Sequence, residues 1–530
     1  MNTTIHTSDE IDWNLCSSPY LTSPKFVRLQ RIPVHVRTNI AIQAYEAQQN
    51  SRWGVITALS REYQISRTFI YALLFIFKQA VQGVFAPKDH SLSKVNLVEA
   101  VEERILSYRM EGKSSIEGIS TLLVRENSLY SSVGYISEYL TSIGESLPNT
   151  LSNHGSTTQA INYVYDEVFS KSHPILITAD PISSAILKIE LADQRSSDTW
   201  ESHFQNITNS GFSPKLLTSD EGTGLCAARA KMFPEIPWQL DTFHGIAHRL
   251  GEWCRRLERL ACKAIEAEYK SESILNSAKS DSVINKRLIL SINAAEEAMQ
   301  AIELYDSFRY LYHYLVHQLN IFNANGDLRQ RDEVKLNMEA ALELLESLEH
   351  AAINKEVSSI KGNLSDLLTY FNTAEGVIQS CQKLCPDQDA LRALCLAWQW
   401  NKASIKSKKA ARKANASEQR NLHLELAALF INDEQKLPEL KSAIFNELDE
   451  IVQASSMVEC INSILRPYLN SSKNQVNQEF LNLFMFYHNH RRYRAGKRKG
   501  RTPMEILTGH EQKEDWIALL RKEVRKKEPA

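Results

Sequence analysis

Residues 248–446 most constrain the fold, because this stretch reads as helical almost throughout and contains few glycines or prolines. Segments such as EVKLNMEAALELLESLEHAA place apolar residues three and four positions apart, the spacing of one helix face. The sequence before this stretch contains short apolar runs that are typical of strands. We therefore expect a mixed α/β core that is interrupted by a large all-helical insertion at residues 251–450.

The chain has 530 residues, so three or four structural units are expected. Its hydrophobic content of 43% and charged content of 23% are ordinary for globular proteins, and no apolar stretch approaches the roughly 18 residues of a membrane span. The N-terminus, MNTTIHTSDEIDWNLCSSPY, lacks the basic start and apolar run of a signal peptide. We expect a cytoplasmic protein without a membrane role, associated with the nucleoid if the source is bacterial.

Cysteines and total charge give little guidance to function. The eight cysteines form no pair of CxxC knuckles and no CxxC with a matching HxxxH, which excludes a zinc finger, and we assign them no role. The net charge is −2, yet basic residues cluster in two runs, KASIKSKKAARK at 402–413 and RRYRAGKRKGR at 491–501. Such runs are either solvated surface or contacts for phosphates.

A helix-turn-helix pattern follows a flexible segment predicted at residues 1–35. In the first unit, residues 36–90, one helix is expected near 55–63, then a turn at Gln64 and Ile65, then a helix capped by Ser66 and running to about residue 77. Arg67 and Thr68 would lie at the N-terminal end of that helix, where a recognition helix meets base edges.

A second block, residues 91–147, repeats this plan. A helix from about Ser115, a turn near residues 127–130 and a helix capped by Ser131 or Ser132 are expected. A plain helical hairpin without DNA contacts is the alternative for either block. Residues 148–173, with Pro148 and Gly155 among many Ser, Thr and Asn, are predicted to be a linker.

Residues 174–250 have the pattern of an α/β core. Strands are expected at 175–179, 185–191 and 215–219, with a helix opened by Ser197 or Asp198. Asp180 and Asp220 each end an apolar run and would emerge at the carboxyl ends of strands. Two carboxylates held in this way suit Mg²⁺ or Mn²⁺, and a third would complete a site for two ions that assist phosphoryl transfer.

The third carboxylate is predicted to be Glu459, near the start of a helix. Asn462 and Arg466 follow at three and seven residues and share its face, so metal and phosphate could be bound together. Glu479 is the rival, but it lies in an amphipathic helix, before Phe480, Phe484 and Tyr487, and is typical of a solvated position.

The chain resembles the DDE transposases and integrases in the order strand-end Asp, strand-end Asp and helical Glu, followed by YHNHRRYRAGKRKGRTPMEIL. The resemblance implies a ribonuclease H-like catalytic domain. It also implies that Asp180, Asp220 and Glu459 bind two Mg²⁺ or Mn²⁺ ions, with water and then a DNA 3′-hydroxyl as nucleophiles. Double-stranded DNA, as transposon ends and target, would be the partner, and the family synapses two ends as a homo-oligomer.

One further element matches transposases that carry a helical insertion before the Glu. Asp241 precedes His244 by three residues, similar to their (Cys/Asp)-x-x-His element, and this implies that His244 positions a nucleotide. The spacing from Asp180 to Asp220 is short for the fold, so Asp193 and Asp198 stay as alternatives for the first carboxylate.

The segment 451–510 is predicted to complete the core, and 511–530 to be a C-terminal helix or tail. Seven basic residues after the catalytic helix are predicted to contact phosphates beside the cut. They are Arg491, Arg492, Arg494, Lys497, Arg498, Lys499 and Arg501. Within the insertion, the lysine-rich stretch after Trp398 and Trp400 is the part best suited to contact DNA or a second subunit.

The sequence therefore predicts a multidomain, mostly α-helical protein with helix-turn-helix units and a ribonuclease H-like mixed sheet split by a helical insertion. The expected function is that of a DNA transposase that cleaves and transfers strands. A catalytically silent, transposase-derived DNA-binding regulator is the alternative, and a helical scaffold protein explains the strand-end carboxylates less well.

Overall fold

The computed structural model describes residues 32–85, 94–126, 128, 130–153, 155, 157–431 and 435–526. Most of the predicted flexible segment 1–35, and two positions of the predicted turn at 127–130, lie outside these residues. The chain divides into two compact units between Glu99 and Ala100. Each unit has its own hydrophobic core, and each is described separately below.

The first unit contains three helices, α1 (Val34–Gln49), α2 (Val55–Glu62) and α3 (Arg67–Phe85). Gln64 turns the chain with a φ of 52°, and buried Ile65 anchors that turn in the core. The Ser66 hydroxyl accepts the Phe69 N–H at 3.1 Å, so the predicted cap is confirmed. The helix that it caps continues beyond the predicted end at residue 77.

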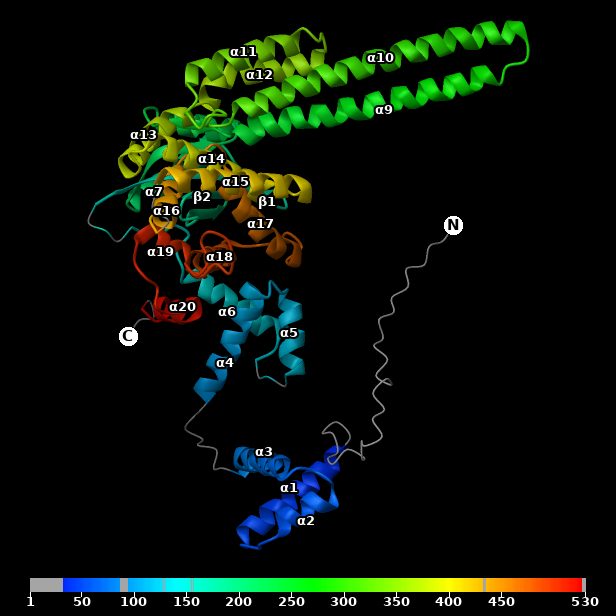
Figure 1. Ribbon diagram of the computed structural model, residues 1–530. Helices are drawn as coiled ribbons and strands as arrows, with labels where there is room; N and C mark the ends of the chain where they lie inside the picture. The colour runs from blue at the N-terminus through cyan, green and yellow to red at the C-terminus, as the bar shows by residue number, and fades with distance from the viewer. Residues whose placement is uncertain are drawn as a thin grey trace. The chain divides into compact units, whose positions relative to one another are not determined.

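Within the described part of the second unit, five strands form one sheet in the order β3-β2-β1-β4-β5 (Figure 1). The neighbours β1 and β2, like β2 and β3, are antiparallel, whereas β1, β4 and β5 are parallel. The strands are β1 (Gln159–Ser170), β2 (His173–Ala179), β3 (Ile186–Leu191), β4 (Phe212–Ser219) and β5 (Trp238–Leu240).

The central strand β1 lies inside the segment 148–173 that was predicted to be a linker, so that prediction was wrong for residues 159–170. The strand is hard to recognise because polar residues such as Asn162 and Asp166 interrupt its apolar pattern. Alternate side chains point to opposite faces of a strand. Tyr163 and Tyr165 therefore lie in one core and Val164 in the other.

Helices cover both faces of the sheet. On the face of Tyr163 and Tyr165 lie α7 (Ser197–Asn209) and α8 (Thr223–Met232). The core on the Val164 face includes residues from helices at both ends of the unit. These helices are α4 (Lys94–Leu106), α5 (Ile116–Arg125), α6 (Val133–Glu145), α17 (Ser456–Ser471), α18 (Gln478–His490) and α20 (Trp516–Arg525).

The second predicted helix-turn-helix block thus forms its helices, with Ser115 and Ser132 as caps, but shares its core with the sheet. It is not a separate unit at 91–147 as expected. Its buried Ile119, Leu123 and Ile136 pack in the same cluster as residues of α17 and α18, which explains the difference.

The outer strand β3 is protected by amides from α18. Asn489 accepts the Ile186 N–H at 2.8 Å and donates to the Ile186 carbonyl at 2.9 Å, while Gln478 accepts the Leu191 N–H at 2.7 Å. An unpaired strand edge invites pairing with another chain. The C-terminal segment therefore completes the sheet although it follows the insertion.

The predicted helical insertion separates β5 from α17 (Figure 1). Helices α9 and α10 form a long antiparallel hairpin, which Figure 1 shows projecting from the rest of this unit. After the π-helix η4 (Phe243–His248) come α9 (Arg249–Asn276), α10 (Asp281–Gln318), α11 (Arg331–Glu346), α12 (Ala351–Leu367), α13 (Tyr370–Leu384), α14 (Gln388–Lys406), α15 (Ala410–Ile431) and α16 (Leu437–Leu448).

The remaining elements are the short π-helix η3 (Ser107–Glu111) and α19 (Pro503–Thr508). Among the described helices, none is long and apolar enough to cross a membrane.

Candidate active site

The candidate site begins with Asp166, in the second half of β1. It lies on the same face as Val164, which is the face covered by α17. Val164 pairs with Thr218 in the parallel ladder between β1 and β4. Two residues further along both strands come Asp166 and Asp220, so the register places these two carboxylates at the same level on neighbouring strands.

Helix α17 adds the third carboxylate from above the sheet. Glu459 lies in its first turn, and its Oε1 is 3.4 Å from Nε2 of His244. One turn later, the buried Asn462 donates a hydrogen bond from Nδ2 to Oδ2 of Asp166 at 3.1 Å. The helix therefore ties the sheet carboxylate and the helical carboxylate into one cluster.

The electrostatics of the cluster indicate crowded negative charge. Burial, together with the charges of Asp220 and Glu459, raises the pKa of Asp166 to about 7. The hydrogen bond with Glu459 raises the pKa of His244, and the same bond lowers the pKa of Glu459. A cation at this position would relieve the repulsion.

Asp241 connects the two segments that carry His244 and Glu459. Its Oδ1 accepts the N–H groups of Phe243 at 2.7 Å and His244 at 3.0 Å, and its Oδ2 accepts the N–H of Ser455 at 2.8 Å. Ser455 is the residue before α17. One buried carboxylate therefore fixes both the turn that carries His244 and the start of the helix that carries Glu459.

The insertion is attached beside the second carboxylate. Glu221, the neighbour of Asp220, forms an ion pair of 3.0 Å with Arg249 of α9 and accepts a hydrogen bond of 3.2 Å from Asn363 of α12. Gln239 of β5 also accepts the Tyr370 N–H at 2.6 Å. These contacts fix the position of the insertion relative to Asp220 and the end of β4.

Asp180 was predicted to be the first carboxylate, but it is not among the charges that act on Asp166. Strand β2 runs antiparallel to β1, and its last residue, Ala179, pairs with Val164, so β2 and β4 run in opposite directions. The Asp180 carboxylate instead accepts the N–H of Ser183 at 2.7 Å, which closes the turn before β3. A strand-end position therefore does not by itself define the site.

The other sequence candidates also lie elsewhere. Asp193 is fully exposed after β3, and Asp198 is in the first turn of α7. Glu479 packs its backbone against Gly144 of α6. Arg466 is exposed on α17, near enough for its charge to lower the pKa of Glu459 further.

Asp166 is the residue that sequence reasoning missed. The signal was present in QAINYVYDEVFS, where Ile161, Tyr163 and Tyr165 alternate with other side chains as in a strand. Placing a strand there would also have resolved the short spacing, since two strands then fit between the first carboxylate and β4.

The cluster suits divalent metal by its chemistry. Carboxylate oxygens are the ligands that Mg²⁺ prefers, and the raised pKa of Asp166 marks a position that lacks positive charge. Within the described residues, no three His, Cys, Asp or Glu side chains already stand at coordination distance from one point. The side chains would therefore have to close around an ion by rotation.

The basic segment after α18 is less free than its composition suggests. Arg492 pairs with Glu505 at 2.9 Å, and Arg498 donates to the Ile182 carbonyl at 2.7 Å in the turn that Asp180 closes. Lys497 pairs with Asp449 at 2.8 Å. The guanidinium of Arg491 lies 5.6 Å from the ring centre of Tyr493.

Arg494, Lys499 and Arg501 are exposed, as are Arg67 and Thr68 at the start of α3 in the first unit. These five positions are accessible to an external phosphate. The predicted contacts with DNA stay predictions for all of the basic residues.

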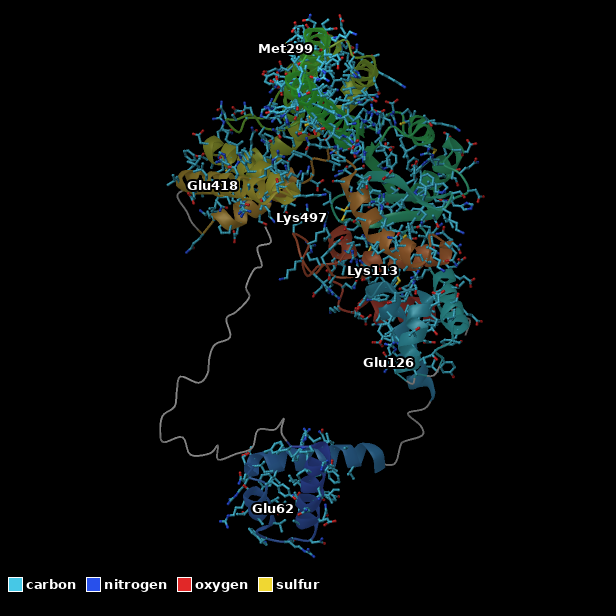
Figure 2. All side chains as sticks on the ribbon, turned by 90° about the vertical axis from the view of Figure 1, so that its right-hand side faces the viewer. Glu62, Lys113, Glu126, Met299, Glu418 and Lys497 are labelled. Carbon is cyan, nitrogen blue, oxygen red and sulfur yellow. The ribbon has the colours of Figure 1, made fainter. Side chains whose placement is uncertain are left out.

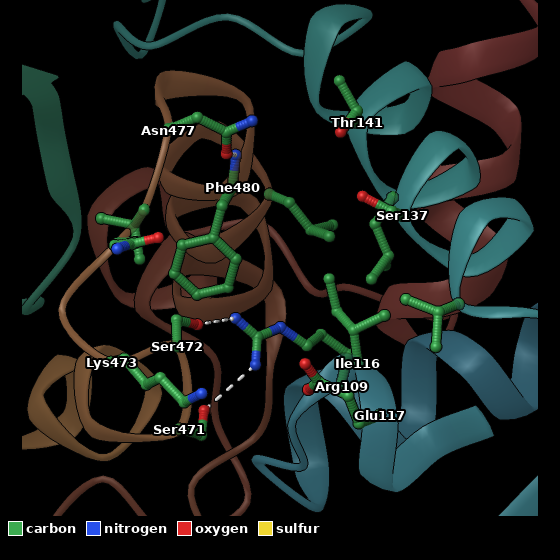
Figure 3. Close-up of a pocket in the computed structure, with 15 residues that line it drawn as sticks. Arg109, Ile116, Glu117, Ser137, Thr141, Ser471, Ser472, Lys473, Asn477 and Phe480 are labelled. Carbon is green, nitrogen blue, oxygen red and sulfur yellow. Dashed lines mark hydrogen bonds between the residues drawn. The ribbon is translucent and has the colours of Figure 1, made fainter. Parts of the chain in front are cut away.

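A separate cavity of about 560 Å³ lies between α6 and the segment after α17 (Figure 3). Its buried arginine, Arg109, donates to the hydroxyls of Ser471 at 3.1 Å and Ser472 at 2.8 Å, and lies over the ring of Phe480. Burial lowers the pKa of Arg109 to about 10. Because it also donates to the Ser114 carbonyl, this arginine serves as an internal tie between segments.

Comparison with known proteins points to a transposase. Residues 165–372 match a family model described as Transposase, Mutator family, and this match supports a transposase. The matched region contains Asp166, Asp220 and His244 and ends before Glu459. No curated protein sequence shows a significant match to the chain.

Proposed function

We propose that the chain is a DNA transposase whose catalytic carboxylates are Asp166, Asp220 and Glu459. The observation that carries the proposal is the geometry of the cluster: the register of β1 and β4 sets Asp166 beside Asp220, and Asn462, on the helix that carries Glu459, donates to Asp166 at 3.1 Å. The raised pKa of Asp166 agrees with this crowding of carboxylates. The strand order, with a central β1 parallel to β4, supports a ribonuclease H-like core. Asp166 replaces Asp180 as the first carboxylate.

The three carboxylates would hold two Mg²⁺ or Mn²⁺ ions. When bound, such ions supply activation of the attacking oxygen and stabilisation of the leaving oxygen. Asn462 keeps the Asp166 carboxylate oriented, and His244 does the same for Glu459. Because Asp241 binds both the turn that carries His244 and the start of the helix that carries Asn462, it fixes the positions of these two residues relative to each other.

The chemistry is phosphoryl transfer in two steps. Water attacks a phosphorus at the element end, one P–O bond forms, and the bond to the 3′-oxygen breaks to leave a 3′-hydroxyl. That hydroxyl then attacks a phosphorus of the target strand and releases the target's own 3′-hydroxyl. Joining two ends requires at least two copies of the chain in one complex.

Recognition of the element ends is assigned to the first unit. Arg67 and Thr68 are exposed at the start of α3, and a helix in this arrangement can enter the major groove.

The test is a cleavage assay on labelled duplex that carries the ends of the element encoding the chain, with Mg²⁺, Mn²⁺ or EDTA. We expect metal-dependent cleavage at the ends, reduced at least about a hundredfold in Asp166→Asn and Glu459→Gln because each removes a ligand charge. Asp180→Asn is the matched control, since an amide oxygen can still close its turn.

Loss of cleavage in Asp180→Asn with full cleavage in Asp166→Asn would show that Asp180 is the first carboxylate, as the sequence predicted. It would reject the site proposed here. Specific binding of the ends without cleavage in either metal would favour the alternative of a DNA-binding regulator.

A further inference from the structure

The last turn of α14 carries basic residues toward the candidate active site. No acidic residue occurs between Asp389 and Glu418, a stretch that contains seven Lys or Arg. We name residues 406–413 the lysine turn, because they join α14 to α15 and include Lys408, Lys409 and Arg412, all exposed. A surface this one-sided in charge attracts anions.

The lysine turn begins one helical turn after Lys402, so the contacts of Lys402 locate it in the fold. The charge of Asp241 acts on the ammonium of Lys406, the first residue of the turn, and opposes the fall in its pKa that desolvation causes. Asp241 is the residue that fixes His244 and the start of α17.

One helical turn earlier, a second contact joins the insertion to the basic segment after α18. The ammonium of Lys402 lies 4.0 Å from the ring centre of Trp398. The indole N–H of Trp398 donates to Asp449 at 3.0 Å, and Lys497 pairs with the other oxygen of Asp449 at 2.8 Å. Trp398 of the insertion and Lys497 of the basic segment, which Figure 2 labels, thus share the carboxylate of Asp449.

This cluster has an excess of positive charge. Burial lowers the pKa of Lys402 to about 7, and the charges of Lys406 and Lys497 add to the effect, while Asp449 opposes it. The charge of Asp449 thus acts on two lysines, Lys402 and Lys497, and Lys406 lies near Lys402. A phosphate arriving at this surface would be stabilised by Lys497, which is exposed.

We propose that the lysine turn and the basic segment 491–501 form one phosphate-binding surface, which holds the DNA backbone on the insertion side of the carboxylates. The proposal rests on the transposase function above and adds the insertion to the DNA path. The α9–α10 hairpin does not suit this role, since its distal part, 262–300, mixes both signs of charge.

The experiment measures DNA affinity of the full chain in EDTA over a range of salt concentrations, so that no cleavage interferes. The test variant is Lys408→Ala/Lys409→Ala/Arg412→Ala. The matched control is Lys263→Ala/Lys270→Ala/Lys286→Ala, which removes three exposed lysines from the hairpin.

Each phosphate contact contributes about 0.9 to the slope of log K against log salt concentration. We expect the test variant to lose about 2 to 3 units of slope and to bind roughly 10- to 100-fold more weakly at moderate salt. The hairpin control should keep the wild-type slope. Asp449→Asn should change affinity in the opposite direction, toward tighter binding, because Lys497 and Lys402 lose their neutralising partner.

An unchanged slope in the test variant, alongside normal end cleavage by the wild type, would overturn this surface and leave the proposed function standing. Equal losses in the test variant and the hairpin control would also overturn it, since they would reflect total charge only. If the wild type binds no DNA under any condition, both proposals fail together.

Discussion

At the scale of single residues, the difference between Asp166 and Asp180 is one of surroundings. The Asp180 carboxylate accepts hydrogen bonds from the turn that it closes, which satisfies its charge locally. Asp166 accepts one hydrogen bond from Asn462 and one from the backbone of Glu167, yet the charges of Asp220 and Glu459 raise its pKa. A half-buried carboxylate that the fold leaves short of positive charge is the kind that binds a cation.

This difference predicts a pH-dependent stability. The folded pKa of Asp166 is about 7, above its usual value of 3.8, so the folded state binds the extra proton and loses stability as pH rises from about 4 to 7. In EDTA at pH 8, Asp166→Asn should therefore be more stable than the wild type, by up to about 4 kcal/mol in free energy of unfolding. At about pH 4 and below, the two should be alike.

Adding Mg²⁺ at pH 8 should reverse the order. The wild type and Asp180→Asn should gain thermal stability, whereas Asp166→Asn should gain little, because a bound ion stabilises only the folded form that holds it. Scanning calorimetry of the three proteins checks this. A gain in Asp166→Asn as large as in the wild type would argue against metal at this cluster.

The residues that sequence reasoning found and missed differ in their local pattern. Asp220, His244 and Glu459 were found because an apolar run, a short motif and a helix face mark them in the text. Asp166 was missed because its own polarity, with that of Asn162, breaks the apolar run of a central strand. The polarity that suits Asp166 for a metal site also makes its strand hard to recognise in the sequence.

At the scale of elements, the closing motif has a structural explanation. Arg492 and Thr502 both bind Glu505, which forms the capping box of α19. Burial would raise the pKa of Glu505, but the N–H groups of Thr502 and Gln512 and the Arg492 guanidinium hold it below its usual range. In the sequence YHNHRRYRAGKRKGRTPMEIL, the elements Asn489-x-x-Arg492 and Thr502-Pro-x-Glu505 thus set the conformation of the basic segment between them.

We therefore predict that Arg492→Ala acts on stability. Leaving the mostly buried Glu505 without its guanidinium should cost about 1–2 kcal/mol, discounted because Arg492 is 43% exposed. Arg494→Ala, at an exposed position of the same segment, should change stability by less than about 0.5 kcal/mol. Chemical denaturation measures both.

If Arg492→Ala unfolds like the wild type but binds DNA with a reduced salt slope, the original prediction of a direct phosphate contact holds for that residue.

The elements themselves were largely predictable where helical periodicity is long. The insertion, the caps at Ser66, Ser115 and Ser132 and the strands around residues 175–191 and 215–219 agree with the pattern of the sequence. Strand direction was not predictable from the text, since an apolar run reads alike either way. That is why β2 and β4 were expected to run in the same direction, whereas β2 is antiparallel to β1 and β4 is parallel to it.

At the scale of the whole molecule, the two units have separate cores. The buried residues of the first unit come from α1 to α3 and the residues next to them, and none of them belongs to the clusters of the second unit within the described chain. Stability of the catalytic unit should therefore not depend on the first unit.

A chain that starts at residue 94 tests this independence. Its melting temperature should match the main transition of the full chain within about 2 °C, because no core contact is removed. Binding to random duplex should persist with a steep salt dependence, while preference for the element ends should be lost. A large drop in melting temperature would show that the first unit supports the second.

Under the proposed function, the order of the carboxylates along the chain sets when the protein can become active during synthesis. Glu459 follows Asp166 by 293 positions (459 minus 166), and the whole insertion lies between them. At about 5–20 residues per second, roughly 15 to 60 seconds of translation separate the two. The first unit is synthesised before Asp166. A nascent or prematurely terminated chain that lacks Glu459 therefore has the first unit but no complete cluster of carboxylates. Fragments released by stalled ribosomes would then occupy element ends without cutting them, and would compete with the finished enzyme.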